Sequence, residues 1–330
     1  MNRTSLVESV VTATRLAAAA VTLAVLSPDT GAAQEGGYQT GDSPQGVSLQ
    51  DQGPGWVAIK GSWLDVDVAG NIYVVNRDRA TMTLLDRSLA VRAEVGGPGW
   101  EPGTFDLPGG VWARNGLDIY VADYGNHRIQ RFDRTLSFVS EFRTRDEENA
   151  DIRFGYPADV ALSRLGELYI CDTENIRVLK IDPKTQSSTT FGGIGGGKGR
   201  LSRPGALQIG PRDNLYVLDG SRIVVFDPFG NFLRELYSSL FTSPSAIFAD
   251  EVRLLVLQGD SLYCLDANER ILPAFPVESV EGTQGSSVRS IAFGRGTLFL
   301  LAEERLVAIP DPWRGGEGNP GSVDTEGKNR

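Results

Sequence analysis

A short apolar strand motif recurs six times along the chain, and this internal repeat limits the possible folds more than any other feature of the sequence. Each copy has a large apolar or aromatic residue at its centre, and these residues are Tyr73, Tyr120, Tyr169, Tyr216, Leu255 and Phe299. Their successive separations are 47, 49, 47, 39 and 44 residues. A repeat of this length is typical of solenoids and propellers.

The segment from Leu107 to Phe132 shows what one repeat contains. A Leu107-Pro108 entry leads to a short apolar strand, a turn at Asn115-Gly116, a second strand, another turn and a third strand over 129–132. The turns are too short for a crossover helix, so consecutive strands must be antiparallel. A fourth strand is predicted in four units, at residues 91–95, 138–142, 188–191 and 232–236.

Six such units predict an all-β fold, a six-bladed β-propeller of four-stranded antiparallel blades over residues 47–310. The last unit lacks a fourth strand after Pro310. We expect the N-terminal segment Val47 to Ile59 to supply that strand and to close the ring. Residues 311–330 are rich in Gly, Asp and Glu, which predicts a disordered polar tail.

The N-terminal 33 residues have the pattern of a secretory signal peptide. An apolar run from Leu16 to Leu26 follows Arg15, is too short to span a bilayer, and is followed by small residues up to Ala33. We therefore expect residues 1–33 to be removed, residues 34–46 to form a flexible lead-in, and the protein to be secreted or periplasmic with no transmembrane anchor. The alternative is an N-terminal helix that stays on the protein.

Composition excludes several function classes. The net charge of −10 and the pI of about 4.8 make nucleic acid and anionic membranes poor partners. The single histidine, His127, excludes sites that need two or more histidines, and no nucleophile elbow surrounds it. Cys171 and Cys264 lie in different units, too far apart for a disulfide, which predicts two buried free thiols.

The turn Asn126-His127-Arg128 and its flanking strands resemble an NHL repeat, and the resemblance extends over roughly residues 45–310. NHL repeats are characterised by an Asp after the second strand and an Arg that opens the third. Three units match, with the pairs Asp123/Arg128, Asp172/Arg177 and Asp219/Arg222. We interpret these pairs as structural, as charge-assisted hydrogen bonds that tie the turn between strands or to the next blade. His127 is interpreted as an exposed turn residue.

The resemblance implies a fold and leaves the function open, because NHL-like propellers serve unrelated purposes. The animal tripartite-motif type carries zinc modules rich in Cys and His, which this sequence lacks. The peptidyl-hydroxyglycine lyase type binds zinc through several histidines, which one histidine cannot provide. The gluconolactonase and regucalcin type holds a divalent metal with a Glu, Asn residues and an Asp, and composition leaves this type possible.

Residues of the inner strands are the candidates for a site in the channel of the propeller or at its mouth. They are Asp65, Asp67, Trp112, Asp159 and Gln208. They do not form the ligand set that the lactonases suggest, so we interpret the carboxylates as solvated or hydrogen-bonded to backbone amides. No catalytic residue, metal ligand or cofactor is assigned, although a divalent cation remains possible.

Two loops and a group of tryptophans have alternative interpretations. Gly192 to Gly199 looks like a phosphate loop but lacks its ending, so we interpret it as a flexible loop between blades. The acidic insertion Arg145 to Asp151 is a solvated loop or a partner contact. Four tryptophans in the first third of the chain either fill the core or form a stacking surface at one mouth of the ring, and they are Trp56, Trp63, Trp100 and Trp112.

The leading hypothesis is an exported bacterial, monomeric NHL-type propeller that acts as a non-enzymatic binding scaffold for a protein, peptide or glycan on one face. The alternative is a metal-dependent hydrolase, lactonase or lyase with a carboxylate site in the channel. A sensor domain of a larger system is a weaker third hypothesis.

Overall fold

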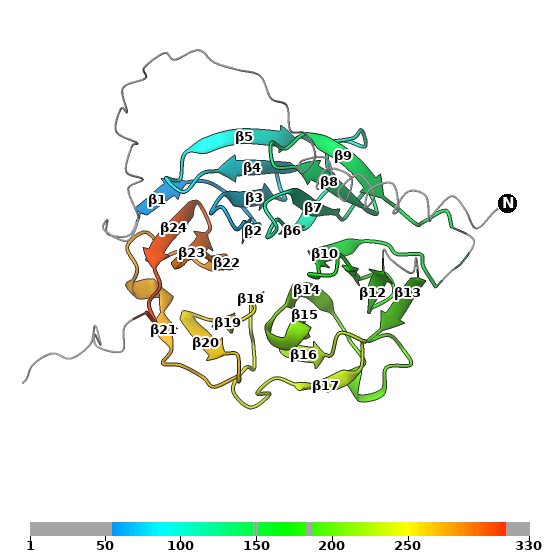
Figure 1. Cartoon of the computed structure of the whole chain (residues 1–330). Coiled ribbons are helices and arrows are strands. Elements are labelled where there is room, and N and C mark those ends of the chain that lie inside the picture. Colours follow the sequence, from blue (N-terminus) through cyan, green and yellow to red (C-terminus); the bar gives the residue numbers. More distant parts are fainter. Residues whose placement is uncertain (1–54, 148, 150, 183–186, 315–330) are drawn as a thin grey trace, which may run out of the picture.

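The computed structural model describes residues 55–147, 149, 151–182 and 187–314, and these form six four-stranded antiparallel sheets arranged around a central axis (Figure 1). The predicted all-β six-bladed propeller is confirmed. In the described part of the chain the helical elements are three short 3-10 turns, at Gly197–Gly199, Pro211–Asp213 and Val277–Ser279. No described helix is long and apolar enough to cross a membrane.

Each blade runs from an inner strand at the axis to an outer strand at the perimeter. Blade 1 contains β2 (Trp63–Val66), β3 (Ile72–Asn76), β4 (Thr81–Leu85) and β5 (Val91–Gly96). Blade 2 contains β6 (Pro108–Trp112), β7 (Asp118–Asp123), β8 (Arg128–Asp133) and β9 (Phe138–Phe142). Blade 3 contains β10 (Pro157–Leu162), β11 (Leu168–Asp172), β12 (Arg177–Asp182) and β13 (Ser187–Phe191).

The second half of the ring repeats this order. Blade 4 contains β14 (Pro204–Ile209), β15 (Leu215–Asp219), β16 (Arg222–Phe226) and β17 (Phe232–Glu235). Blade 5 contains β18 (Ala246–Ala249), β19 (Arg253–Gln258), β20 (Ser261–Asp266) and the two-residue β21 (Phe275–Pro276). Blade 6 contains β22 (Val288–Gly294), β23 (Thr297–Ala302), β24 (Arg305–Pro310) and the N-terminal strand β1 (Gly55–Ala58).

Strand β1 occupies the outer position of blade 6. It pairs antiparallel with β24, with Gly55 opposite Ala308 and Ala58 opposite Arg305. The strand lies within the segment that the sequence suggested for this place. The predicted signal peptide, the lead-in and residues 315–330 of the tail lie outside the described residues.

The core lies between the blades, because each sheet is packed on both faces by its neighbours. Every residue of β3 and β4 is buried, and so is every residue of β15. Cys171 in β11 and Cys264 in β20 are buried free thiols, as predicted. Burial raises the pKa of Cys171 well above the ordinary value and that of Cys264 to about 11.

The antiparallel order gives the ring two faces. One face holds the links from each outer strand to the next inner strand, together with the turns between second and third strands. We call this the upper face. The lower face holds the turns between first and second strands and those between third and fourth strands. Inner strands therefore begin at the upper face and end at the lower one.

Candidate functional site

The Asp/Arg pairs of blades 2, 3 and 4 form ion pairs on the upper face. The N–O separations are 2.7 Å for Asp123 and Arg128, 2.9 Å for Asp172 and Arg177, and 2.9 Å for Asp219 and Arg222. The three aspartates are completely or almost completely buried. A buried ion pair needs further hydrogen bonds to offset desolvation, and the link that enters each blade supplies them.

Each aspartate accepts a backbone N–H bond from a residue 17 positions earlier, in that link. The donors are Asp106 at 2.8 Å, Gly155 at 3.2 Å and Ser202 at 2.9 Å. Each arginine donates to a carbonyl of the same link, that of Thr104, Arg153 or Arg200. The pairs therefore fasten the incoming link to the blade that follows it.

In two other blades a neutral side-chain amide, instead of an Asp/Arg pair, bonds to the incoming link. In blade 1 the Asn76 amide donates to the carbonyl of Lys60 at 3.1 Å. In blade 5 the Gln258 carbonyl oxygen accepts the N–H groups of Thr242 at 2.8 Å and Ser243 at 2.9 Å. The fastening is therefore ionic in blades 2 to 4 and neutral in blades 1 and 5.

A cavity of 250 Å³ lies on the axis of the ring. Its wall includes residues at the start of four inner strands, which indicates a mouth on the upper face, and these are Ser62, Gly205, Ser245 and Arg289. Of the sequence-predicted channel residues, Asp65, Asp159 and Gln208 line it. Trp63 and Phe248 add aromatic surface to the wall.

Arg114 crosses the axis beyond the end of β6. Its guanidinium donates to the carbonyl of Ala249 in blade 5 and to the Gln208 side chain in blade 4. It also lies over the Phe248 ring, 4.6 Å from the centroid, and 3.5 Å from an oxygen of Asp65. One side chain thus connects blades 1, 2, 4 and 5 near the lower end of the cavity.

The two buried carboxyl groups of the cavity connect neighbouring blades. Asp65 accepts the N–H of Ala113 in the segment after β6 at 2.9 Å, and Asp159 accepts that of Leu207 in β14 at 2.9 Å. Burial raises the pKa of both groups, that of Asp159 to about 7, and the charge of Asp65 adds to the effect on Asp159. Asp159 can therefore exchange a proton near neutral pH.

Two of the five channel candidates lie elsewhere. Asp67 organises a lower-face turn, where it accepts the backbone N–H of Asn71 at 2.8 Å and the hydroxyl of Tyr73 at 3.3 Å. Trp112 is buried and packs edge-on against Tyr120, with centroids 6.0 Å apart. Among the described residues, no three His, Cys, Asp or Glu side chains gather in a way that could hold a metal ion.

An aromatic surface lies on the upper face where blades 1, 2 and 3 meet. Tyr156 packs on Tyr124 with centroids 5.1 Å apart and on His127 with centroids 4.1 Å apart. Arg77 lies over the Tyr124 ring at 4.8 Å. We call this group, together with the exposed Trp100, Leu107 and Ile176 of the adjoining link and turns, the Tyr156 surface.

His127 fixes the position of Tyr156. Its Nδ1 accepts the backbone N–H of Tyr156 at 3.0 Å and a bond from Arg145 at 2.8 Å. Partial burial and the charge of Arg145 lower the pKa of His127, which favours the neutral ring that can accept these bonds. The histidine is a half-buried connector between blades 2 and 3, whereas the sequence suggested an exposed turn residue.

Four residues of the Tyr156 surface have a left-handed backbone. The φ angles are 48° at Leu107, 53° at His127, 49° at Tyr156 and 52° at Ile176. Large side chains rarely adopt this conformation, which costs about 1 kcal/mol or more at each residue. Sequence reasoning missed Tyr124 and Tyr156, although Tyr156 stands directly before a strand-opening proline, as Leu107 does.

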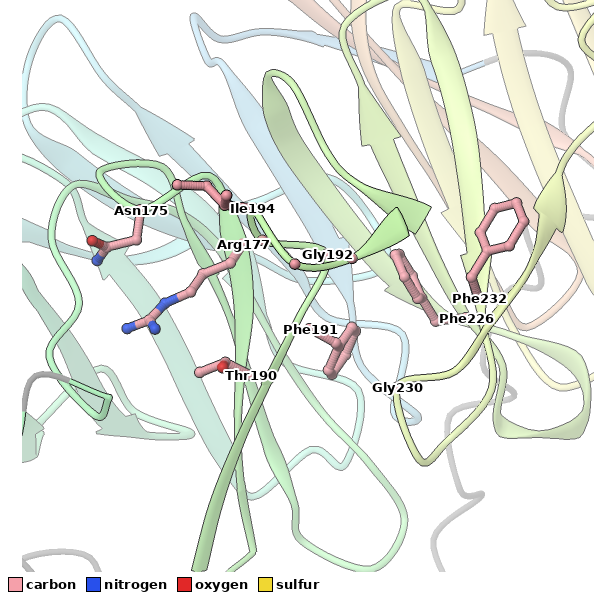
Figure 2. Close-up of a pocket in the computed structure, with 12 residues that line it drawn as sticks. Asn175, Arg177, Thr190, Phe191, Gly192, Ile194, Phe226, Gly230 and Phe232 are labelled. Carbon is pink, nitrogen blue, oxygen red and sulfur yellow. The ribbon is translucent and has the colours of Figure 1, made fainter. Parts of the chain in front are cut away.

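A groove of 580 Å³ lies between blades 3 and 4, at the perimeter (Figure 2). Its base is a row of rings, with Phe191 5.0 Å from Phe226 and Phe226 6.4 Å from Phe232. Gly192 to Gly196 form one side, and Asn175 and Arg177 lie at one end. Of the tryptophans in the first third of the chain, Trp112 is buried, while Trp56 on the outer strand β1 and Trp100 are exposed.

Comparisons of the sequence with known proteins found one family model and a relative that match part of the chain. The family model described as "NHL repeat" matches residues 105–132 and 154–181. The chain is 29% identical over 109 residues to a probable peptidyl-alpha-hydroxyglycine alpha-amidating lyase, pgal-1, of Caenorhabditis elegans. That alignment covers 32% of this chain and 29% of the lyase, so the chain spans less than a third of that relative.

Solved structures with this architecture have diverse titles. A virginiamycin B lyase from Staphylococcus aureus has a TM-score of 0.54 at 10% identity, covering 78% of this chain and 98% of its own. A gluconolactonase from Xanthomonas campestris has a TM-score of 0.54 at 13% identity, covering 77% and 87%. A chain of a nidogen/laminin complex has a TM-score of 0.51 at 14% identity, covering 66% and 81%. At these identities the similarity shows the fold alone.

Proposed function

We propose, on the premise that this chain is a six-bladed β-propeller with NHL repeats, that it is an exported, non-enzymatic scaffold that binds a protein partner through the Tyr156 surface. Propellers of this architecture include enzymes and at least one chain from a complex between proteins, so the fold permits either role. The choice rests on the chemistry of the surface.

The observation that carries the proposal is the fixed position of Tyr156. Tyr156 is 38% exposed, yet its ring is packed against Tyr124 and His127 and its backbone is held in the left-handed region. A rigid aromatic side chain loses little conformational entropy on binding, which is why Tyr, Trp and Arg dominate the energetics of protein interfaces. The left-handed backbone and the two ring contacts together hold the Tyr156 side chain in one position.

Charges around the surface favour a protein over a glycan. Arg77 and Arg145 contact the aromatic group directly, and Glu174 lies 3.9 Å from Arg145. Cations and anions arranged around an aromatic centre provide electrostatic complementarity to a charged protein surface. A neutral glycan would use the aromatic rings without these charges.

Capture of partners from the protein's own source by the purified whole chain, followed by measurement of Kd, tests the proposal. Trp100→Ala and Tyr156→Ala should each weaken binding about 30-fold, which corresponds to the loss of about 2 kcal/mol at a central aromatic. Leu165→Ala is the matched control, because Leu165 is a large apolar side chain exposed on a lower-face turn. Equal binding by all three variants, or binding to immobilised glycans alone, would reject a protein partner at this surface.

The second candidate is a hydrolase, lactonase or lyase that uses the axial cavity. The observation that favours it is Asp159, a buried carboxyl group with a pKa of about 7 that faces a cavity of 250 Å³. The test is an assay of lactone and ester turnover, with and without divalent cations. Activity that is present in the wild type and lost in Asp159→Asn would support this candidate. Against it, both cavity carboxyl groups are engaged with backbone amides of the next blade.

A further inference from the structure

The outer strand of blade 3, β13, differs from the outer strands of the other large blades. Its sequence, Ser187–Phe191, contains no charged residue and no proline, and its first four residues are exposed. By contrast, β5 carries Arg92 and Glu94, β9 carries Glu141, and β17 carries Arg234 and Glu235. Charged residues on outer strands prevent pairing with other chains, and β13 lacks this protection.

Strand β13 is also regular. The pairs β4–β5, β8–β9 and β16–β17 each contain a register shift, whereas β12 and β13 pair without one from Asp182–Ser187 to Val178–Phe191. A bulge twists an outer strand away from a possible partner, and a regular strand retains a straight edge. Strand β21 has only two residues, and the uncharged, regular β1 has four. In the described chain β13 is thus the longest regular, uncharged outer strand.

The aromatic groove begins where this strand ends. Thr190 and Phe191 belong both to β13 and to the groove wall, and the wall continues over Phe226 and Phe232 of blade 4 (Figure 2). Ile194, which is 86% exposed, stands at its rim. A side chain of a strand added beside β13 would therefore find an apolar base close to the strand end.

The glycines of the groove wall leave room for another backbone. A Cβ atom added to Gly195 would meet no atom within 4 Å, and Gly193 would meet only the Arg177 side chain at 3.6 Å. Other glycines of this region are required by packing, since a Cβ at Gly199 would lie 2.7 Å from Phe232. At Gly193 and Gly195 the wall is thus bare backbone on either side of Ile194, which permits close approach of an extended chain there.

The exposed charges beside the groove are opposite in sign to the net charge of the protein. Lys198 and Arg200 are exposed on the loop that continues the groove wall, while Arg177 of the wall is already paired with Asp172. The chain as a whole has a net charge of −10. A local cationic rim beside an apolar base is complementary to an apolar side chain flanked by carboxylates.

We infer that β13 and the adjoining groove bind an extended acidic peptide segment of a partner protein, which adds to blade 3 as a fifth strand and inserts one apolar or aromatic side chain over Phe191 and Phe232. Backbone hydrogen bonds to β13 supply the affinity, and the groove and its cationic rim select the sequence. This site adjoins the Tyr156 surface, because Asn175 and Arg177 of the groove wall flank Ile176, but it does not depend on the function proposed for that surface.

Selection of a random peptide library on the whole chain tests the inference. The selected peptides should alternate apolar and polar residues, carry an aromatic or large aliphatic residue, and be acidic. Affinity for the whole chain is then measured by fluorescence anisotropy with one selected peptide. Amide hydrogen exchange should show new protection at residues 188–190 when that peptide is bound.

Matched substitutions separate this site from other places. Thr189→Glu places a charge on the edge and should weaken the selected peptide at least tenfold, whereas the uncharged, β-branched Thr189→Val should preserve binding. Gly195→Trp fills the groove from a position with free space and should weaken binding to a similar extent as Thr189→Glu. Ser140→Glu, the matched change on outer strand β9, should leave the affinity unchanged.

The inference is overturned by any of three results. The first is the absence of enriched peptides, and the second is enrichment of basic sequences. The third is a selected peptide whose affinity is unaffected by Thr189→Glu and Gly195→Trp. Circular dichroism of each variant shows whether a loss of binding reflects unfolding, and the protection pattern at residues 188–190 of the unchanged chain tests strand addition without any substitution.

Discussion

Replacement of Arg128 by alanine should be the most destabilising change among the arginines of the three ionic fastenings. The Arg128 side chain is 2% exposed and bonds to Asp123 at 2.7 Å and to Glu141 at 2.7 Å. Removing it leaves the fully buried Asp123 without its cation. Breaking a buried pair in this way costs about 3–5 kcal/mol of unfolding free energy, because the remaining charge is desolvated and unpaired.

The other two arginines allow a comparison of the loss in unfolding free energy within the same protein. The Arg177 side chain is 14% exposed and that of Arg222 is 28% exposed, so water can solvate the remaining aspartate progressively better. We expect Arg177→Ala to have an intermediate effect and Arg222→Ala to cost about 1 kcal/mol, close to the range of accessible pairs. The effect should therefore decrease from blade 2 to blade 4.

Urea unfolding of the whole chain, followed by tryptophan fluorescence, measures these differences. A double variant Asp123→Asn/Arg128→Ala should be more stable than the sum of its single changes predicts, because it removes the unpaired charge. A cost below 1 kcal/mol for Arg128→Ala, or equal costs for all three arginines, would refute the assignment of a buried ionic fastening to blade 2.

Three further predictions concern the axis of the ring. The raised pKa of Asp159 means that the folded protein holds this proton more tightly than the unfolded chain, so the stabilisation is fully present below about pH 3.8 and is lost as the pH rises through about 7. The unfolding free energy of the wild type minus that of Asp159→Asn should fall by about 1.4 kcal/mol per pH unit between pH 4 and 7, and a flat difference would show that Asp159 stays ionised. Arg114→Ala should cost about 3 kcal/mol, with partial recovery in Arg114→Lys, because it leaves the buried Asp65 carboxylate without its nearby cation. Thermal unfolding of both variants checks this, and a melting temperature of Arg114→Ala equal to that of the wild type would contradict it. Gly110→Ala should cost about 2 kcal/mol, because its Cβ would lie 1.7 Å from an oxygen of Asp159, whereas Gly195→Ala should stay within about 0.5 kcal/mol of the wild type in the same unfolding assay.

The propeller architecture could be predicted because each blade is a continuous stretch of sequence with a recognisable pattern. Each blade carries its own short turns and its own apolar middle strands, so the order of the strands follows from spacing alone. The Asp/Arg pairs were also visible, since both partners belong to one hairpin, as Asp123 and Arg128 do. The sequence could not show that each pair also bonds outside its hairpin, to the link whose donor lies 17 residues before the aspartate.

The candidate site depends on contacts between blades, which no single repeat encodes. Tyr156 and His127 meet because the link into blade 3 passes over a turn of blade 2, and their spacing in sequence carries no periodic signal. The left-handed backbone at Tyr156 was equally hidden, because glycine is the residue that normally marks this conformation. No signal in the sequence marks Arg114, although its side chain crosses the axis to blades 4 and 5.

The division between ionic and neutral fastenings means that parts of the ring should respond differently to acid. Burial raises the pKa of Asp123, so protonation of that carboxyl group weakens the ionic fastening of blade 2, while the amides of Asn76 and Gln258 do not titrate. Acid should therefore loosen the upper-face link of blade 2 first, and leave those of blades 1 and 5 in place. The propeller would then open by sectors, with partial unfolding confined to one arc of the circle before the whole ring is lost.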